Sequence, residues 1–209
     1  MSAAVIALLG AESTGKSTLA HLLGQSLVGA GIDGVVVPEA LRDFCAMHGR
    51  TPVAGEQAQL ADMQSARIRN AARRHAVVIA DTTALMTAVY SDIYFNDSSL
   101  YEAAVAQQRA CHLTLLAGAD LPWVPDGLLR DGPHMRARVD ARLREVLREQ
   151  DIAFSVVLGL GPARAAAARA AVWRCLHPPQ GAAETTRWRW VCQHCGDGSC
   201  EAAVLALSR

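Results

Sequence analysis

Eight residues near the amino terminus, Gly10-Ala-Glu-Ser-Thr-Gly15-Lys16-Ser17, fit the pattern G-x-x-x-x-G-K-[ST]. The pattern follows an apolar run typical of a buried strand and precedes a stretch typical of a helix. Glycines let such a loop fold around phosphate oxygens, with backbone N–H groups at the positive end of the helix pointing at them. The stretch therefore predicts a P-loop that binds a nucleoside triphosphate. A chance match in a glycine-containing turn is the competing interpretation, and the predicted strand and helix argue against it.

The lysine of this pattern is the only one in the chain, since the other nineteen basic residues are arginine. Its position indicates a need for an ammonium group at residue 16. We expect Lys16 to reach the β- and γ-phosphates, and the Ser17 hydroxyl to ligate Mg²⁺.

The composition of the 209 residues is 51% hydrophobic, 19% charged and 5% aromatic, with twenty acidic residues balancing twenty basic ones. It favours a folded protein with an aliphatic core over a disordered chain. The neutral balance argues against a general attraction to nucleic acid or anionic lipid, so phosphate binding must be local. No stretch approaches the roughly 20 apolar residues that span a bilayer, and no basic leader precedes the loop, so we expect a cytoplasmic protein.

Short apolar, β-branched runs alternate with helical stretches, which predicts an α/β fold with helices on both faces of a parallel sheet. The predicted strands are Ala3 to Leu9, Gly34 to Val37, Ala76 to Ala80, His112 to Ala117 and Phe154 to Leu158. The predicted helices are Lys16 to Ala30, Glu56 to His75, Ser99 to Ala110, Pro133 to Gln150 and Pro162 to Leu176. We expect a P-loop domain over 1–176. Residues 177–209 are predicted to form a connector and a small cysteine-containing appendage.

Two carboxylates follow predicted strands, where ligands of open parallel sheets collect. Asp81 ends the third strand and is typical of a Mg²⁺ ligand, while a helix N-cap is the alternative role. Glu39 follows the second strand and would stand one helical turn before Arg42. Either the two form a surface ion pair, or Glu39 holds or deprotonates an acceptor hydroxyl while Arg42 binds phosphate or orients the carboxylate.

An arginine-rich segment, residues 121–138, follows the fourth strand and carries prolines and glycines. This pattern is typical of a cover that closes over phosphate and brings guanidinium groups to the developing charge. At least one of Arg130, Arg136 and Arg138 is expected to act there. Trp123 would either stack on a flat ligand or anchor the segment in apolar surroundings.

Three of the six cysteines, Cys192, Cys195 and Cys200, stand at the spacing of metal ligands. A structural Zn²⁺ would need a fourth ligand, for which His194, His177 and Cys175 are candidates. A redox pair and ordinary free thiols are the alternatives.

Several of these segments together resemble the nicotinamide riboside kinase domain of NadR-type proteins, over roughly residues 3–152. They are the P-loop with Glu12-Ser13, then Glu39-x-x-Arg42, then Asp81-Thr-Thr83 with Tyr90, and the segment Asp120-Leu-Pro-Trp123-Val-Pro-Asp126-Gly127. The resemblance implies a nucleoside-kinase-like fold. It also implies ATP- and Mg²⁺-dependent phosphorylation of the 5′-hydroxyl of nicotinamide riboside to nicotinamide mononucleotide.

The P-loop and the resemblance together give the expected site residues. Nucleotide binding is expected at Gly10, Glu12, Ser13, Thr14, Gly15, Lys16, Ser17 and Thr18. Metal binding is expected at Ser17 and Asp81, and substrate contacts at Glu39, Arg42, Trp123 and Asp126. The catalytic candidates are Lys16, Glu39, Asp81, Arg130 and Arg136. The chain begins a few residues before the P-loop and has no His-x-Gly-His signature, so DNA-binding and adenylyltransferase activities are not expected.

Three other functions stay open at this point. One is a P-loop kinase for a different nucleoside or small molecule. Another is a nucleotide-dependent switch or ATPase that docks a partner through its carboxyl-terminal tail. The third is a zinc-dependent nucleic-acid binder, suggested by Arg187-Trp-Arg-Trp190 beside the cysteines, which the neutral charge disfavours.

Overall fold

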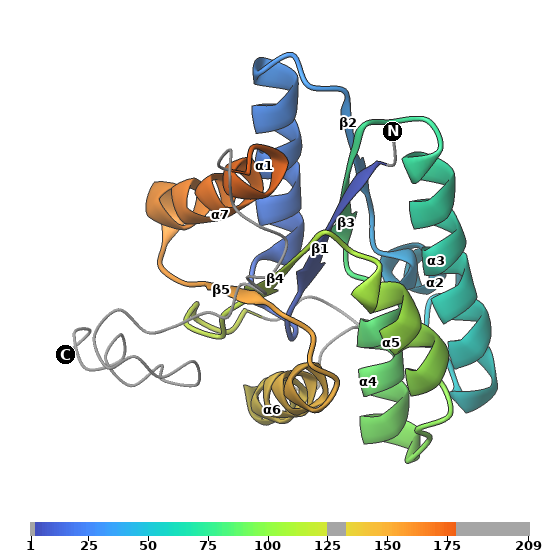
Figure 1. Cartoon of the computed structure of the whole chain (residues 1–209). Helices are drawn as coiled ribbons and strands as arrows, with labels where there is room; N and C mark the ends of the chain where they lie inside the picture. The colour runs from blue at the N-terminus through green and yellow to red at the C-terminus, as the bar shows by residue number, and fades with distance from the viewer. Residues whose placement is uncertain (1–2, 125–132, 179–209) are drawn as a thin grey trace.

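The computed structural model describes residues 3–124 and 133–178 (Figure 1). Its centre is a five-stranded sheet in the order β2-β3-β1-β4-β5, with every neighbouring pair parallel. The strands are β1 (Ala4–Leu9), β2 (Gly34–Val37), β3 (Val77–Asp81), β4 (Leu113–Ala117) and β5 (Ser155–Val157). The predicted parallel sheet is confirmed, and each predicted strand lies within two residues of an observed one.

Helices cover both faces of this sheet, as the sequence predicts (Figure 1). One face carries α1 (Lys16–Gly29) and α7 (Gly161–Leu176). The other carries α3 (Gln57–Ala72), α4 (Ala84–Phe95), α5 (Tyr101–Arg109) and α6 (Pro133–Glu149). A short helix α2 (Ala40–His48) and a 3₁₀ turn η1 (Ala54–Glu56) lie between β2 and α3.

Alternate side chains of the central strands fill the two cores, because successive residues of a strand point to opposite faces. In β1, Ile6 and Leu8 pack under α1 and α7, whereas Leu9 packs on the opposite face. In β4, Leu115 likewise packs on the side of α1 and α7, and Leu116 packs on the opposite face. This burial on both faces explains the continuous apolar runs of the sequence.

The sequence prediction omitted α2 and α4 from its helices. Seven of the twelve residues of α4 are buried, so it lacks the polar face that makes a helix easy to recognise. None of the helices in the described ranges is long and apolar enough to cross a membrane. Residues 179–209, with nearly all of the predicted connector and appendage, lie outside the described residues.

Gly10, the residue after β1, lies close to the end of β4. Its φ is +141°, and a Cβ built there would lie 2.8 Å from the carbonyl oxygen of Ala117 at the end of β4. Because the obstructing atom belongs to the backbone, a side chain at residue 10 would have to push β4 away from the loop. Gly31 also has a positive φ, of +69°, but has open space around it.

Comparison of Gly10→Ala with Gly31→Ala therefore separates two costs to stability, the strain of a positive φ and the clash with a neighbouring strand. We expect Gly31→Ala to lower the free energy of unfolding by about 1 kcal/mol, the cost of a left-handed alanine. Gly10→Ala adds the clash with Ala117 and should cost about 2 kcal/mol or more. Urea denaturation of both variants measures the difference, and equal losses would contradict the close approach.

Candidate active site

The loop between β1 and α1 holds its lysine and a threonine against one backbone carbonyl. Lys16 is 8% exposed, and its Nζ donates to the Ala11 oxygen at 2.7 Å. The Thr14 hydroxyl donates to the same oxygen at 2.8 Å. The N-cap residue Gly15 has a φ of +73°, which turns the chain into α1. The lysine ammonium and the first N–H groups of α1 thus meet at the carboxyl edge of the sheet, as the P-loop pattern predicts.

Asp81 lies beside this loop because β3 pairs with β1. It is in register with Leu8, and the N–H of Thr82 donates to the Leu8 oxygen at 3.1 Å. The carboxylate is buried, and its Oδ1 has no hydrogen-bond partner among the residues that the structure describes. A buried carboxylate oxygen without a partner costs free energy unless a ligand satisfies it. The alternative role as an N-cap is wrong, since Thr83 caps α4 by accepting from the N–H of Leu85.

Glu39 forms an ion pair with Arg42, as one of the two interpretations of the sequence has it. The Arg42 Nε lies 3.3 Å from Glu39 Oε2, with the glutamate side chain 11% exposed and the arginine 39%. The carboxylate therefore lies in a partly buried wall, while the guanidinium reaches solvent beside it. This geometry suits an arginine that orients the carboxylate, one of the two roles that the sequence left open.

Gln64 of α3 joins the two carboxylate-bearing segments. Its Oε1 accepts from the N–H of Ala40, next to Glu39, at 2.7 Å, and its Nε2 donates to the oxygen of Thr82, next to Asp81, at 3.2 Å. The side chain is 2% exposed. Both ends of one buried amide thus fix the spacing between the segments that carry Glu39 and Asp81.

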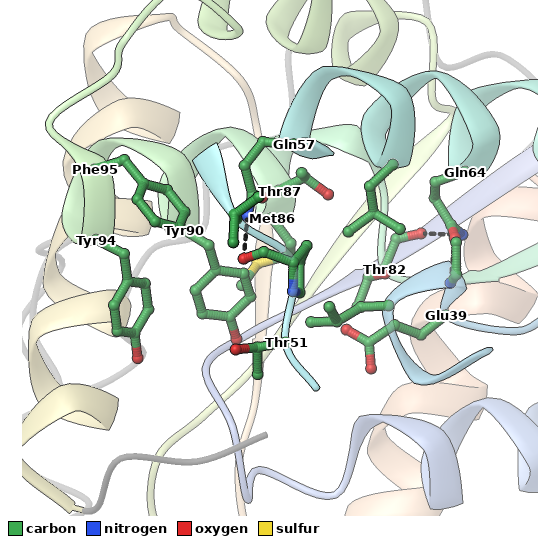
Figure 2. A pocket seen from close by; sticks show the side chains of 15 residues that line it. Glu39, Thr51, Gln57, Gln64, Thr82, Met86, Thr87, Tyr90, Tyr94 and Phe95 are labelled. Carbon is green, nitrogen blue, oxygen red and sulfur yellow. Dashed lines mark hydrogen bonds between the residues drawn. The ribbon is translucent and has the colours of Figure 1, made fainter. Parts of the chain in front are cut away.

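A cavity of about 350 Å³ opens at this junction. Figure 2 shows Tyr90, Tyr94 and Phe95 on one side of it, and Glu39, Gln64 and Thr82 on the other. The tyrosine ring centroids are 6.2 Å apart. The volume of the cavity lies in the range of small-molecule binding sites. An apolar wall that faces a few polar groups is also typical of such sites.

Backbone strain marks both sides of the site. Ser13 in the P-loop has a φ of +58°, and Thr82 in the cavity wall has a φ of +72°. A β-branched residue rarely adopts a positive φ, whereas Asn96 and Asp151, the other non-glycine residues of the described chain with positive φ, are of types that tolerate it. Such strain tends to be kept where it serves a binding geometry.

The segment after β4 lies against the P-loop rather than in the cavity. The Ser13 hydroxyl donates to the Val124 oxygen at 2.9 Å and accepts from the Val124 N–H at 2.8 Å. Arg136 donates from Nη1 to the Leu121 oxygen at 2.7 Å and from Nη2 to the Ala119 oxygen at 2.6 Å. Arg136 therefore supports this segment through its backbone. Trp123 is not among the residues that line the cavity, so its predicted substrate contact stays a prediction.

The structure brings Lys16, Asp81 and Glu39 to one edge of the sheet, as the sequence predicts. Asp126, Arg130 and the zinc candidates Cys192, Cys195 and Cys200 lie outside the described residues. Sequence reasoning missed Gln64 and Tyr94. The sequence did contain a signal for Gln64. Leu60 and Ala61 mark the buried face of α3, and Gln64 lies on the same face one helical turn later.

The three described cysteines, Cys45, Cys111 and Cys175, are free. Burial raises the pKa of each thiol, to about 11 for Cys111, and the charge of Glu39 raises that of Cys45 further. Protonated thiols are poor nucleophiles and poor metal ligands. Within 3–124 and 133–178, no group of three or more histidine, cysteine or acidic side chains could hold a metal ion. The zinc site therefore stays a prediction about the tail.

A family model described as an AAA domain matches residues 5–164. This match covers most of the chain, so the chain belongs to that family. Among curated proteins, none matches the chain.

Solved structures share the fold at low sequence identity. NadR in complex with NAD and AMP-PNP has a TM-score of 0.65 at 20% identity, over 81% of this chain and 48% of that one. NadR in complex with NR has a TM-score of 0.61 at 21% identity, over 81% of this chain and 50% of that one. The chain thus spans about half the length of either NadR chain. Thymidylate kinase from Ehrlichia chaffeensis has a TM-score of 0.58 at 14% identity, over 84% of this chain and all of that one.

Gln64→Met tests whether the buried amide holds the two carboxylate-bearing segments together. The variant leaves the Ala40 N–H and the Thr82 oxygen without their partner, so we expect the free energy of unfolding to fall by about 1–3 kcal/mol. Ser65→Ala is the matched control. It removes a buried hydroxyl from the same helix, whose Oγ donates only to the Ala61 oxygen one turn earlier, and should cost under about 1 kcal/mol. Urea denaturation compares them; a loss no larger in Gln64→Met than in the control would contradict the bridging role.

Proposed function

We propose that this member of the AAA domain family is a small-molecule kinase that uses ATP and Mg²⁺ to phosphorylate the 5′-hydroxyl of nicotinamide riboside. The observation that carries the proposal is the pairing of two sites at one edge of the sheet. A P-loop follows β1, and a cavity with a buried carboxylate and an aromatic wall follows β2 and β3. Phosphoryl transfer requires a donor and an acceptor held side by side, and depends mainly on positioning and charge stabilisation.

The donor side is the P-loop, residues 10–18. Its backbone N–H groups would surround the phosphates, and Lys16 would exchange its bond to the Ala11 carbonyl for the β- and γ-phosphate oxygens. The lysine already lies within the loop and is largely shielded from water, so its charge is little screened. Glu12, Ser13 and Thr14 belong to the loop before the helix, whereas Ser17 and Thr18 lie in the first turn of α1, which begins at Lys16.

The residues present fit a Mg²⁺ ion. Asp81 supplies a buried carboxylate oxygen that has no partner in the described chain, and Ser17 supplies a hydroxyl in the first turn of α1. Oxygen ligands of these kinds are the ones that Mg²⁺ prefers. The ion would supply charge neutralisation at the phosphates during transfer.

The acceptor side is the cavity lined by Glu39. Its carboxylate would hold the acceptor hydroxyl and receive its proton, while Arg42 keeps the carboxylate in one orientation. The aromatic side chains of α4 would contact a planar ring at the far end of the cavity (Figure 2). A hydroxyl-binding end and a ring-binding end are what a nucleoside requires.

Two observations support nicotinamide riboside as the nucleoside. The segments Glu12-Ser13 and Asp120-Leu-Pro-Trp123 resemble NadR-type kinases, and the solved NadR structures that share this fold contain NR or NAD with AMP-PNP. The second candidate function is phosphorylation of another nucleoside or nucleotide. It is favoured by the full-length fold match of thymidylate kinase.

The acceptor is identified by measuring ADP release from Mg²⁺-ATP without acceptor, with nicotinamide riboside, with the common nucleosides and thymidine monophosphate, and with several sugars. We expect turnover to depend on the acceptor and to peak with nicotinamide riboside. Lys16→Ala is the control variant and should lose nearly all turnover, because no other lysine can replace the charge.

A peak with another nucleoside would leave the kinase function in place and replace the acceptor. ADP release at the same rate without any acceptor would contradict the kinase proposal and favour a nucleotide-dependent switch. Activity of Lys16→Ala near that of the unchanged protein would contradict the assignment of the donor site.

Asp81→Asn tests the metal role. Loss of the charged ligand should lower kcat roughly tenfold or more and raise the Mg²⁺ concentration needed for half-maximal rate. Asp33→Asn is the control, since Asp33 lies before β2 at the opposite edge of the sheet, where it pairs with His75. A Mg²⁺ titration at saturating ATP compares the two variants, and an unchanged titration for Asp81→Asn would remove Asp81 from the metal site.

A further inference from the structure

A buried guanidinium lies directly behind the P-loop. Arg164, in the first turn of α7, is 5% exposed. Its Nη2 donates to the oxygens of Thr14 at 2.9 Å and Gly118 at 3.2 Å. Its Nη1 donates to the Gly159 oxygen at 3.2 Å. One side chain therefore joins the loops that follow β1, β4 and β5.

Asp120 provides the charge that lets this arginine be buried. Its Oδ1 accepts from Arg164 Nη1 at 2.8 Å, and its Oδ2 accepts from the Gly159 N–H at 2.6 Å. The carboxylate is thus held from two directions and, together with the three carbonyl oxygens, fixes the orientation of the guanidinium. A buried ion pair is not by itself a source of stability, because the desolvation of both charges offsets their attraction. Its geometry can still serve a specific purpose.

That geometry determines the direction of one peptide group in the P-loop. The Thr14 carbonyl that Arg164 binds belongs to the same peptide unit as the N–H of Gly15, and the described chain contains no cis peptide bond. In a trans peptide the N–H points opposite to the carbonyl. With the carbonyl held toward α7, the Gly15 N–H is turned to the other side, into the loop that would surround the phosphates. A cationic donor on the carbonyl also polarises the peptide and strengthens its N–H as a donor.

We propose that Arg164 is a positioning residue for nucleotide phosphate, which it serves by holding the Thr14–Gly15 peptide with its N–H directed at the phosphate site, and that Asp120 fixes Arg164 for this purpose. The inference rests on the proposed function only in taking the P-loop to bind a nucleotide. It does not depend on which acceptor is phosphorylated.

The test compares the dissociation constants of Mg²⁺-ATP and of tripolyphosphate, measured by calorimetry on the full chain. Tripolyphosphate has no base or sugar, so it reports on the P-loop alone. Arg164→Met keeps an unbranched side chain as far as the ε position and removes the guanidinium with all its donors. We expect it to raise both dissociation constants about tenfold or more, which corresponds to the loss of one charge-assisted hydrogen bond. Arg164→Lys keeps the charge without the planar fork and should lie between Arg164→Met and the unchanged protein.

Arg144→Met is the matched control. Arg144 of α6 is 9% exposed and pairs with Asp140 at 2.7 Å, so its loss also breaks a partly buried ion pair. We expect it to destabilise the fold while changing neither dissociation constant more than about twofold. Thermal unfolding of each variant identifies the temperature range in which it is folded, and binding is measured there.

Two outcomes would overturn the inference. The first is unchanged binding of tripolyphosphate in Arg164→Met; weaker Mg²⁺-ATP binding in the same variant would then place the effect at the base or sugar. The second is an equal rise of the dissociation constants in Arg144→Met. Failure of the unchanged protein to bind Mg²⁺-ATP at all would overturn the proposed function instead. If Arg164→Met is unfolded at every temperature, Arg164→Lys is the variant that tests the proposal. Binding of both ligands by Arg164→Lys as tight as by the unchanged protein would contradict it.

Discussion

The hydrogen bonding of β1 to β3 on one side and to β4 on the other is the constraint on which the site depends. Because the three strands are parallel, their carboxyl ends meet at one edge, and the loop after β1 leaves the sheet between the other two. Gly10 gives the loop room beside Ala117, and the register of Leu8 with Asp81 brings a buried carboxylate to its other side. The sheet therefore determines where the P-loop lies.

Charge burial is the main cost of this arrangement, and the chain meets it with specific partners. Glu39 pairs with Arg42, and Arg164 pairs with Asp120 behind the P-loop. Asp81 is an exception among these charged groups, because its Oδ1 has no partner in the described chain. The backbone of the next residue, Thr82, is strained. An unpartnered carboxylate oxygen next to a strained backbone is what a site that completes itself on binding a ligand would show.

Much of this could be predicted from the sequence because it depends on local patterns. Apolar runs gave the strands, and the P-loop spacing gave Lys16 and Ser17. Helix α4 was missed because its residues are apolar or aromatic on nearly all sides, which leaves no periodic pattern to detect. Gln64 and Arg164 were missed because their roles depend on partners 24 and 150 residues away, which only the fold brings close. The correct role of Thr83 as the N-cap, in place of Asp81, likewise depended on where β3 ends.

In the proposed reaction, the γ-phosphoryl group passes from the P-loop side to a hydroxyl in the cavity beside it. The most direct measurement follows that group, with ATP labelled at the γ-position, nicotinamide riboside in excess and the products separated and identified by mass. We expect the label to appear in a mononucleotide, at the 5′-oxygen, with little in inorganic phosphate. Label that accumulates in inorganic phosphate at the same rate with and without the acceptor would contradict it.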